Sequence, residues 1–167
     1  MEFFNINIIF YLAAYLFGSI PFGSILAKTF AGVDITTAGS KSIGATNVLR
    51  VVKETNPALA KKLGIATVIL DALKGTLVLL VGIYMDVSDS TLWAIAVLAV
   101  LGHCYSAYLK FEGGKGVATG LGVYLVLIPI PTLIGAAVWI VCAKVLKISS
   151  LSSLLGLVAV VISATFL

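Results

Sequence analysis

The stretch LGIATVILDALKGTLVLLVGIY, residues Leu63–Tyr84, decides the kind of solvent in which this chain folds. At about 1.5 Å per residue, an α-helix of this length crosses a hydrocarbon core about 30 Å thick. Its two charged residues, Asp71 and Lys74, are three positions apart and therefore lie on one helical face, where they can pair. We predict a transmembrane helix in which this pair has a structural or supporting role, with a direct role in a site as the alternative.

The composition of the whole chain agrees with this interpretation. Of 167 residues, 60% are hydrophobic and 11% are charged, and the mean hydropathy is +1.16. An average globular domain has roughly a quarter of its residues charged. A soluble enzyme, a disordered chain and a collagen-like chain are therefore excluded. We predict an all-α, polytopic bundle of transmembrane helices with about five to seven membrane segments, and with residues 1–167 as a single domain.

Four other segments are apolar enough to enter the membrane. In the first, the run from Gly18 to Gly23 (GSIPFG) predicts a kink or a close contact between helices. From Val117, Pro129 and Pro131 interrupt the apolar run early, so a short, tilted or re-entrant pair is expected there, with Thr132–Ala143 as its second arm. The four segments are Ile6–Phe30, Thr91–Leu109, Val117–Ala143 and Ile148–Leu167.

The placement of charge predicts the orientation. The segment Ala31–Lys62 is the most basic part of the chain, so the positive-inside rule places it in the cytoplasm and the N-terminus outside. The loop Met85–Ser90 carries two acidic residues and no basic residue, which agrees with that orientation. Cys104 and Cys142 lie within apolar runs without the spacing of metal ligands, so neither a disulfide framework nor a metal site is expected.

Two glycine-rich basic segments have the chemistry of phosphate binding. They are GSKSIGATNVLR, residues Gly39–Arg50, and GGKGVATG, residues Gly113–Gly120. Glycines let backbone N–H groups converge on an anion, while cations and hydroxyls add charge and direction. Neither segment is a Walker A motif. The candidate substrate-binding residues are Ser40, Thr46, Asn47, Arg50, Gly113, Gly114, Lys115 and Gly116.

The simpler alternative for both segments is anchoring to anionic lipid headgroups. It explains the lysines, but it does not explain the glycines or Asn47.

His103 is the only histidine of the chain and lies near the inner end of the third predicted span. Its side chain suits proton transfer near neutral pH, so it is the candidate catalytic residue. A hydrogen-bonding bridge between helices is the alternative role for His103.

Taken in order, these motifs resemble the bacterial acylphosphate-glycerol-3-phosphate acyltransferase family. The resemblance rests on GSKSIGATNVLR, on DALKG at residues 71–75, on Gly102-His103 and on FEGGKGVAT at residues 111–119, with GSIPFG in the first span. It implies an enzyme of the bacterial inner membrane that moves a fatty acyl group from acyl phosphate to the 1-hydroxyl of glycerol 3-phosphate. The products would be lysophosphatidic acid and phosphate, in the first step of phospholipid biosynthesis, with no cofactor and no nucleic acid partner.

The chain departs from the family pattern at several places. Lys41 and Ser42 replace the usual glycine and asparagine, Ser106 stands where proline is common, and Glu112 stands where lysine is common. The family's last span and C-terminal tail are apparently lacking. The alternatives to an acyltransferase are a small membrane transporter of phosphorylated compounds and a non-catalytic membrane subunit. A transporter would need an aqueous path to the outside, where the loop is short and acidic.

Overall fold

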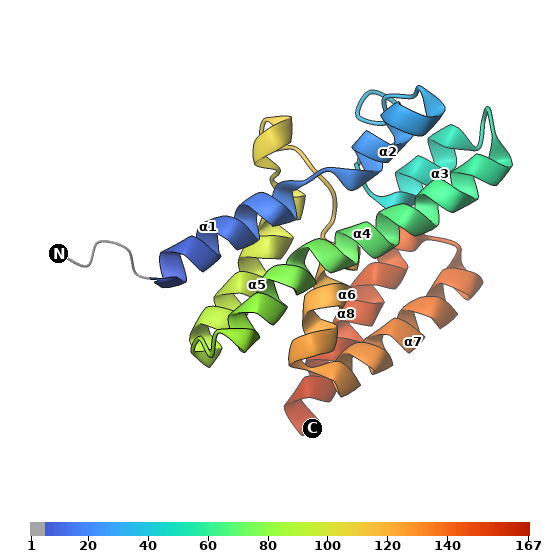
Figure 1. Cartoon of the computed structure of the whole chain (residues 1–167). Helices are drawn as coiled ribbons and strands as arrows, with labels where there is room; N and C mark the ends of the chain where they lie inside the picture. Colours follow the sequence, from blue (N-terminus) through green and yellow to red (C-terminus); the bar gives the residue numbers. More distant parts are fainter. Residues whose placement is uncertain (1–5) are drawn as a thin grey trace. The chain divides into compact units, whose positions relative to one another are not determined.

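The computed structural model describes residues 6–167, which form helices joined by short loops (Figure 1). No strand occurs in this range, which confirms the all-α prediction. The α-helices are α1 Ile6–Ser19, α2 Phe22–Ala31, α3 Ala45–Val52, α4 Pro57–Tyr84, α5 Asp89–Cys104, α6 Val117–Leu127, α7 Pro129–Leu146 and α8 Ser149–Phe166, and η1, Ala107–Leu109, is a 3-10 turn.

Five helical segments within residues 6–167 are long and apolar enough to cross a membrane, in agreement with the predicted number. They are Ile6–Ala31, Pro57–Tyr84, Asp89–Leu109, Pro129–Leu146 and Ser149–Phe166. The predicted outside position of the N-terminus falls on residues 1–5, which lie outside the described residues. The chain divides into two compact units, Met1–Gly120 and Leu121–Leu167. The single domain predicted from the sequence stays a prediction.

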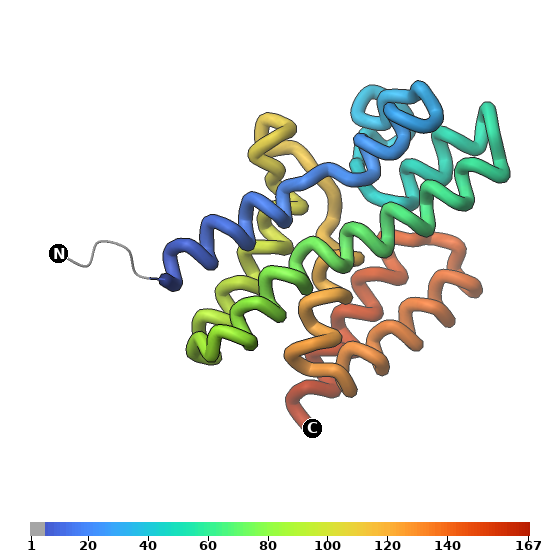
Figure 2. The backbone as a smooth tube through the Cα atoms, viewed as in Figure 1, coloured from blue at the N-terminus to red at the C-terminus, as the bar shows by residue number. Residues whose placement is uncertain are grey.

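The first span is broken where the sequence predicted a kink. Helix α1 ends at Ser19, and α2 begins at Phe22, after Ile20 and Pro21. Figure 2 shows the coil of the backbone interrupted between α1 and α2. Because proline has no N–H and disfavours a helical residue before it, the helix is readily interrupted here. The break exposes backbone groups that other parts of the first unit use, as described below.

Helices α1 and α5 pack closely through small residues. A Cβ atom at Gly18 would overlap the backbone of Ala99, and one at Gly102 would overlap the carbonyl oxygen of Tyr15. Such contacts are typical of membrane bundles, where close packing replaces the hydrophobic effect as the driving force. They confirm the close helix contact predicted at Gly18. Gly23 likewise allows a close contact with the loop between α2 and α3, because a Cβ atom there would overlap the carbonyl oxygen of Ile43.

Helix α4 begins earlier than the sequence predicted. The prediction started it at Leu63, whereas the helix starts at Pro57. Asn56 caps it by accepting a hydrogen bond from the Leu59 N–H at 3.0 Å, and Pro57 occupies the first helical position, where no N–H partner is needed. The extra turns carry Lys61 and Lys62, so polar residues extend a helix whose apolar part was predicted correctly.

The proline-containing region differs from the prediction in one part. Helix α6 is short, at 11 residues, as expected. The predicted short second arm, Thr132–Ala143, was wrong, because α7 runs from Pro129 to Leu146 and is long enough to be a candidate span. Pro129 and Pro131 lie in the first turn of α7, where helix N–H groups have no intrahelical partner and proline is therefore tolerated.

The second unit contains the hairpin of α7 and α8 (Figure 1). Lys147 ends α7 in a left-handed conformation with φ 56°, and its N–H is bonded to the Ala143 carbonyl at 3.2 Å. The two helices meet at Gly135 and Gly156, where a Cβ atom on Gly135 would overlap the Val160 side chain. The hairpin therefore uses the same small-residue packing as α1 and α5.

We predict that Gly102→Ala lowers the stability of the protein by about 1–3 kcal/mol, because an added methyl group must push α1 and α5 apart. The neighbouring variant Leu101→Ala is the matched control, since Leu101 is exposed on the same helix. Thermal unfolding in detergent should show a lower midpoint for Gly102→Ala and little change for Leu101→Ala. Equal midpoints for Gly102→Ala and the unmodified protein would contradict the packing described here.

Candidate functional site

Two loops of the first unit carry five of the eight predicted substrate-binding residues. The first loop, residues 32–44, joins α2 to α3, and the second loop, residues 110–116, joins η1 to α6. Both contain backbone in the left-handed region: φ is 60° at Gly39 and 59° at Lys41 in the first, and 73° at Gly116 in the second. Glycine adopts this conformation without strain, which explains two of the glycines in the motifs.

Asn47 organises the first loop from within α3. Its side chain is 1% exposed. The two N–H groups of the side-chain amide are shared among the carbonyls of Ile35 at 2.9 Å, Ala38 at 3.2 Å and Ser42 at 2.9 Å, and its oxygen accepts from the Ser40 N–H at 2.8 Å. The amide group is thus fully engaged with the loop backbone. This geometry supports a role in shaping the loop, beside the substrate-binding role that the sequence predicted.

Asp34 shapes the entrance to the same loop. Its carboxylate accepts hydrogen bonds from the Thr36 hydroxyl at 2.6 Å and from the Thr36 N–H at 2.9 Å. These two bonds lower the pKa of Asp34 below its usual value, because both favour the charged carboxylate. The ionised Asp34 carboxylate therefore adds to the stability of the folded protein at pH values above the pKa that this residue has in the unfolded chain. This stabilisation is lost as the pH falls through the lowered pKa of the folded state. The Thr36 side chain is oriented by the same contact.

The second loop is tied to the end of the third span and to the break in the first. The Gly114 N–H donates to the His103 carbonyl at 3.0 Å, and the Phe111 N–H donates to the Ser106 carbonyl at 2.8 Å. The buried Ser106 hydroxyl in turn donates to the Ser19 carbonyl at 2.6 Å. Ser106, one of the departures from the family pattern, therefore links the second loop to the end of α1.

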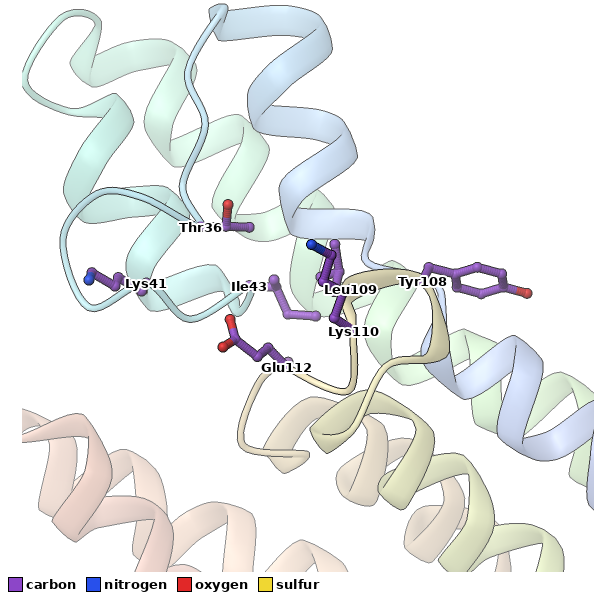
Figure 3. Close-up of a pocket in the computed structure, with 8 residues that line it drawn as sticks. Thr36, Lys41, Ile43, Tyr108, Leu109, Lys110 and Glu112 are labelled. Carbon is purple, nitrogen blue, oxygen red and sulfur yellow. The ribbon is translucent and has the colours of Figure 1, made fainter.

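The two loops line one pocket, with a volume of about 230 Å³ (Figure 3). This volume is below the ~300–1,000 Å³ of pockets for drug-sized ligands, so the pocket has the size for a small molecule. In Figure 3 the Tyr108 ring points away from the other labelled side chains. The lining includes two lysines and one carboxylate, and consists of Thr36, Lys41, Ile43, Tyr108, Leu109, Lys110, Glu112 and Gly113.

A cluster of buried ionisable groups lies behind the second loop. Asp71, Lys74 and His103 are 2%, 2% and 3% exposed. Lys74 Nζ is 2.8 Å from Asp71 Oδ1, which confirms the pair predicted from their spacing. The same nitrogen lies 2.8 Å from His103 Nδ1 and donates to the Ile20 carbonyl, at the break in the first span, at 3.0 Å. Removing one partner of a buried pair costs about 3–5 kcal/mol, so the cluster also stabilises the fold.

The structure brings some of the predicted site residues together and leaves others at the surface. Gly113 lines the pocket, and His103 lies behind Gly114, where an added Cβ atom would overlap His103 Nε2. The catalytic role of His103 stays a prediction, with Nε2 as the nitrogen left to act. Ser40, Thr46, Arg50 and Lys115 are exposed, and Gly116 is buried.

Four polar residues of the pocket were missed as site residues by the sequence analysis: Thr36, Lys41, Lys110 and Glu112. The sequence held a clue to two of them. Lys41 and Glu112 both depart from the family pattern, and in the structure both line this pocket. Lys110 had been used only to predict orientation. Within residues 6–167, no group of three His, Cys, Asp or Glu side chains is arranged to hold a metal ion.

Comparison with known proteins identifies close relatives along nearly the whole chain. Residues 8–167 match the family model described as "Glycerol-3-phosphate acyltransferase". A glycerol-3-phosphate acyltransferase of Aliarcobacter butzleri is 83% identical over 163 residues, which are 98% of this chain and 79% of the relative. The corresponding protein of Sulfurimonas denitrificans is 62% identical over 164 residues, 98% of this chain and 80% of that protein.

Two solved structures have the same fold. Both are of PlsY (YgiH), described as an integral membrane glycerol 3-phosphate acyltransferase. The glycerol 3-phosphate form is 35% identical with a TM-score of 0.81, and covers 93% of this chain and 74% of that one. The lysophosphatidic acid form is 34% identical with a TM-score of 0.78 and the same coverage.

We predict that Asn47→Ala opens the first loop and destabilises the protein by about 1–3 kcal/mol, because the buried carbonyl of Ile35, two partly buried carbonyls and one N–H lose their partner. Hydrogen exchange of the Ser40 amide should become much faster. Asn56→Ala is the matched control, since Asn56 caps α4 through one N–H and does not contact the first loop through any described bond. Unchanged protection of Ser40 in Asn47→Ala would show that the loop holds its shape without this side chain.

Proposed function

This chain belongs to the glycerol-3-phosphate acyltransferase family, and we propose that it uses acyl phosphate as the donor to acylate the 1-hydroxyl of glycerol 3-phosphate. As a member of this family it is an integral membrane enzyme that transfers an acyl group to glycerol 3-phosphate. The observation that supports the finer proposal is that two glycine-containing loops with lysines at Lys41 and Lys110 line one small pocket, in a unit that also contains three candidate spans.

The proposed substrates explain why the site combines these features. Both carry a phosphate group, which calls for cations and converging backbone N–H groups. The acyl chain stays in the bilayer, whereas glycerol 3-phosphate comes from water, so the two meet at the membrane surface. We assign the phosphates to Ser40, Thr46, Arg50 and Lys115 together with the backbone of Gly113 and Gly116, and Asn47 holds the first loop in shape around them. The predicted role of the Gly114 N–H is not retained in the proposal, because this N–H donates to the His103 carbonyl.

The proposed reaction needs no covalent enzyme intermediate. The 1-hydroxyl oxygen of glycerol 3-phosphate forms a bond to the acyl carbon, the bond between that carbon and the phosphate oxygen breaks, and phosphate leaves. The hydroxyl proton goes to an oxygen of the departing phosphate. His103 is the protein group that could accept this proton instead. Because acyl phosphate is a mixed anhydride with a good leaving group, positioning and charge stabilisation supply much of the acceleration.

Acyl phosphate as the donor is what the resemblance to the acylphosphate-dependent family implies, and the histidine pattern supports this choice over an acyl thioester. Acyltransferases that use thioesters carry a histidine followed five positions later by aspartate. The chain has one histidine, His103, and Tyr108 stands at that later position.

We also propose the bacterial inner membrane as the location, with the pocket facing the cytoplasm. Several basic residues belong to the first loop or follow it, and the positive-inside rule places such a segment in the cytoplasm. They are Lys41, Arg50, Lys53, Lys61 and Lys62.

We predict that purified protein converts palmitoyl phosphate and glycerol 3-phosphate to lysophosphatidic acid and phosphate, whereas palmitoyl thioester gives no product. Released phosphate and extracted lipid product would be measured in detergent and in bilayer vesicles. Product from the thioester alone would refute the proposed donor. Uptake of glycerol 3-phosphate into vesicles without any acylated product would instead favour a transporter.

We predict that Arg50→Ala raises KM for glycerol 3-phosphate about 10- to 100-fold with a smaller change in kcat, because a charged hydrogen bond to phosphate acts in the ground state and the transition state alike. Arg50 can hold a phosphate with two parallel N–H groups. Lys53→Ala is the matched control, an exposed cation directly after the same helix. If both variants have the KM of the unmodified enzyme, Arg50 does not bind the substrate.

A further inference from the structure

The buried ammonium group of Lys74 has three acceptors for its three N–H donors. Asp71 Oδ1 lies at 2.8 Å, His103 Nδ1 at 2.8 Å and the Ile20 carbonyl oxygen at 3.0 Å. A protonated amine donates three hydrogen bonds and accepts none. Since the carboxylate of Asp71 favours the charged amine and every donor has an acceptor, the contacts are those of a charged lysine that is fully satisfied inside the first unit.

This arrangement determines which nitrogen of His103 carries the proton. Lys74 can only donate, so Nδ1 of His103 must accept and the proton of the neutral ring lies on Nε2. Asp71 Oδ1 is 3.6 Å from Nδ1, too far for a hydrogen bond. In the familiar serine hydrolase arrangement a carboxylate accepts from Nδ1–H, which leaves Nε2 as a base. Here the lysine contacts both groups and donates to Nδ1, which reverses that polarity.

The protonated nitrogen faces the second loop. A Cβ atom at Gly114 would overlap His103 Nε2, so the ring edge lies directly against the backbone of this loop. The main chain of His103 is bonded to the same residue, because its carbonyl accepts from the Gly114 N–H at 3.0 Å. Lys115, a proposed phosphate ligand, follows immediately. The Nε2 edge of the ring therefore lies against the loop that carries the proposed phosphate ligand Lys115.

We propose that Asp71 and Lys74 are positioning residues that lock His103 as a neutral ring with its proton on Nε2, so that His103 acts as a hydrogen-bond donor and not as a general base. The tautomer is argued from the cluster alone. Its consequence for the reaction rests on the proposed function: the donor stabilises negative charge on a phosphoryl oxygen, and the hydroxyl proton goes to the departing phosphate.

The tautomer can be measured directly, because the chain has a single histidine. Protein labelled with ¹⁵N-histidine in detergent should give a protonated Nε2 and an unprotonated, hydrogen-bonded Nδ1 at neutral pH. In Lys74→Met the Nδ1 resonance should move to a position without a hydrogen bond, and protonation of Nδ1 should appear. Lys144→Met is the control: it changes a lysine in the last turn of α7 and should leave the histidine signals unchanged.

Lys74→Met leaves the buried carboxylate of Asp71 without its partner, which can destabilise the fold. A second variant therefore tests the same prediction without an unpaired buried charge. Asp71→Leu combined with Lys74→Met removes both charges and keeps the site apolar. It should move the Nδ1 resonance in the same way. A proton on Nδ1 in the unmodified protein, a doubly protonated ring at neutral pH, or an Nδ1 resonance that neither variant moves would overturn the proposal.

Kinetics separate a donor from a base. The Nε2 amide of glutamine can replace the Nε2–H of histidine, so His103→Gln should keep kcat within about tenfold of the unmodified enzyme, while His103→Ala falls further. A general base contributes about 10²–10⁴-fold, and glutamine cannot replace it. If kcat falls by the same factor, above about 100-fold, in His103→Gln and in His103→Ala, the donor role is wrong. Without turnover of acyl phosphate by the unmodified protein the proposed function fails, whereas the tautomer is still decided by the nitrogen resonances.

Discussion

Much of the first unit depends on one buried ammonium group. Lys74 of α4 binds Asp71 on its own helix, the Ile20 carbonyl between α1 and α2, and His103 on α5, all within 3.0 Å. Three spans therefore meet at a single charge that has no access to water. Because an unpaired charge in a bilayer is expensive, each of these contacts constrains the positions of the other two.

This junction also sets the position of the two loops. The break at Ile20 turns the first span so that Gly23 packs against Ile43 of the first loop, while His103 and Ser106 hold the second loop through Gly114 and Phe111. Asn47 then fixes the remaining shape of the first loop. The pocket is thus lined by irregular backbone held by buried polar side chains, which is how a membrane protein satisfies such backbone.

The chemistry proposed for this site follows from that rigidity. Transfer from a mixed anhydride demands that an alcohol and an acyl carbon be held together and that charge on phosphoryl oxygens be stabilised. The cations proposed to bind substrate, Arg50 and Lys115, are exposed, while the buried side chains Asn47, Lys74 and His103 are engaged with the protein itself. Binding and positioning are in this way divided between surface and interior residues.

The sequence by itself determined the membrane environment, the helical class, the broken first span and the ion pair of Asp71 and Lys74, and it located the two glycine-rich basic motifs for which phosphate binding is proposed. These follow from local pattern: apolar length, proline, helical spacing and residue type within short windows. The tertiary structure alone decided that Lys41, Lys110 and Glu112 share a pocket, that Asn47 is engaged with loop carbonyls and that Lys74 contacts His103 as well as Asp71. These features join residues as far apart as Lys41 and Glu112, because contacts through α4 and α5 bring together segments whose local sequences carry no information about their partners.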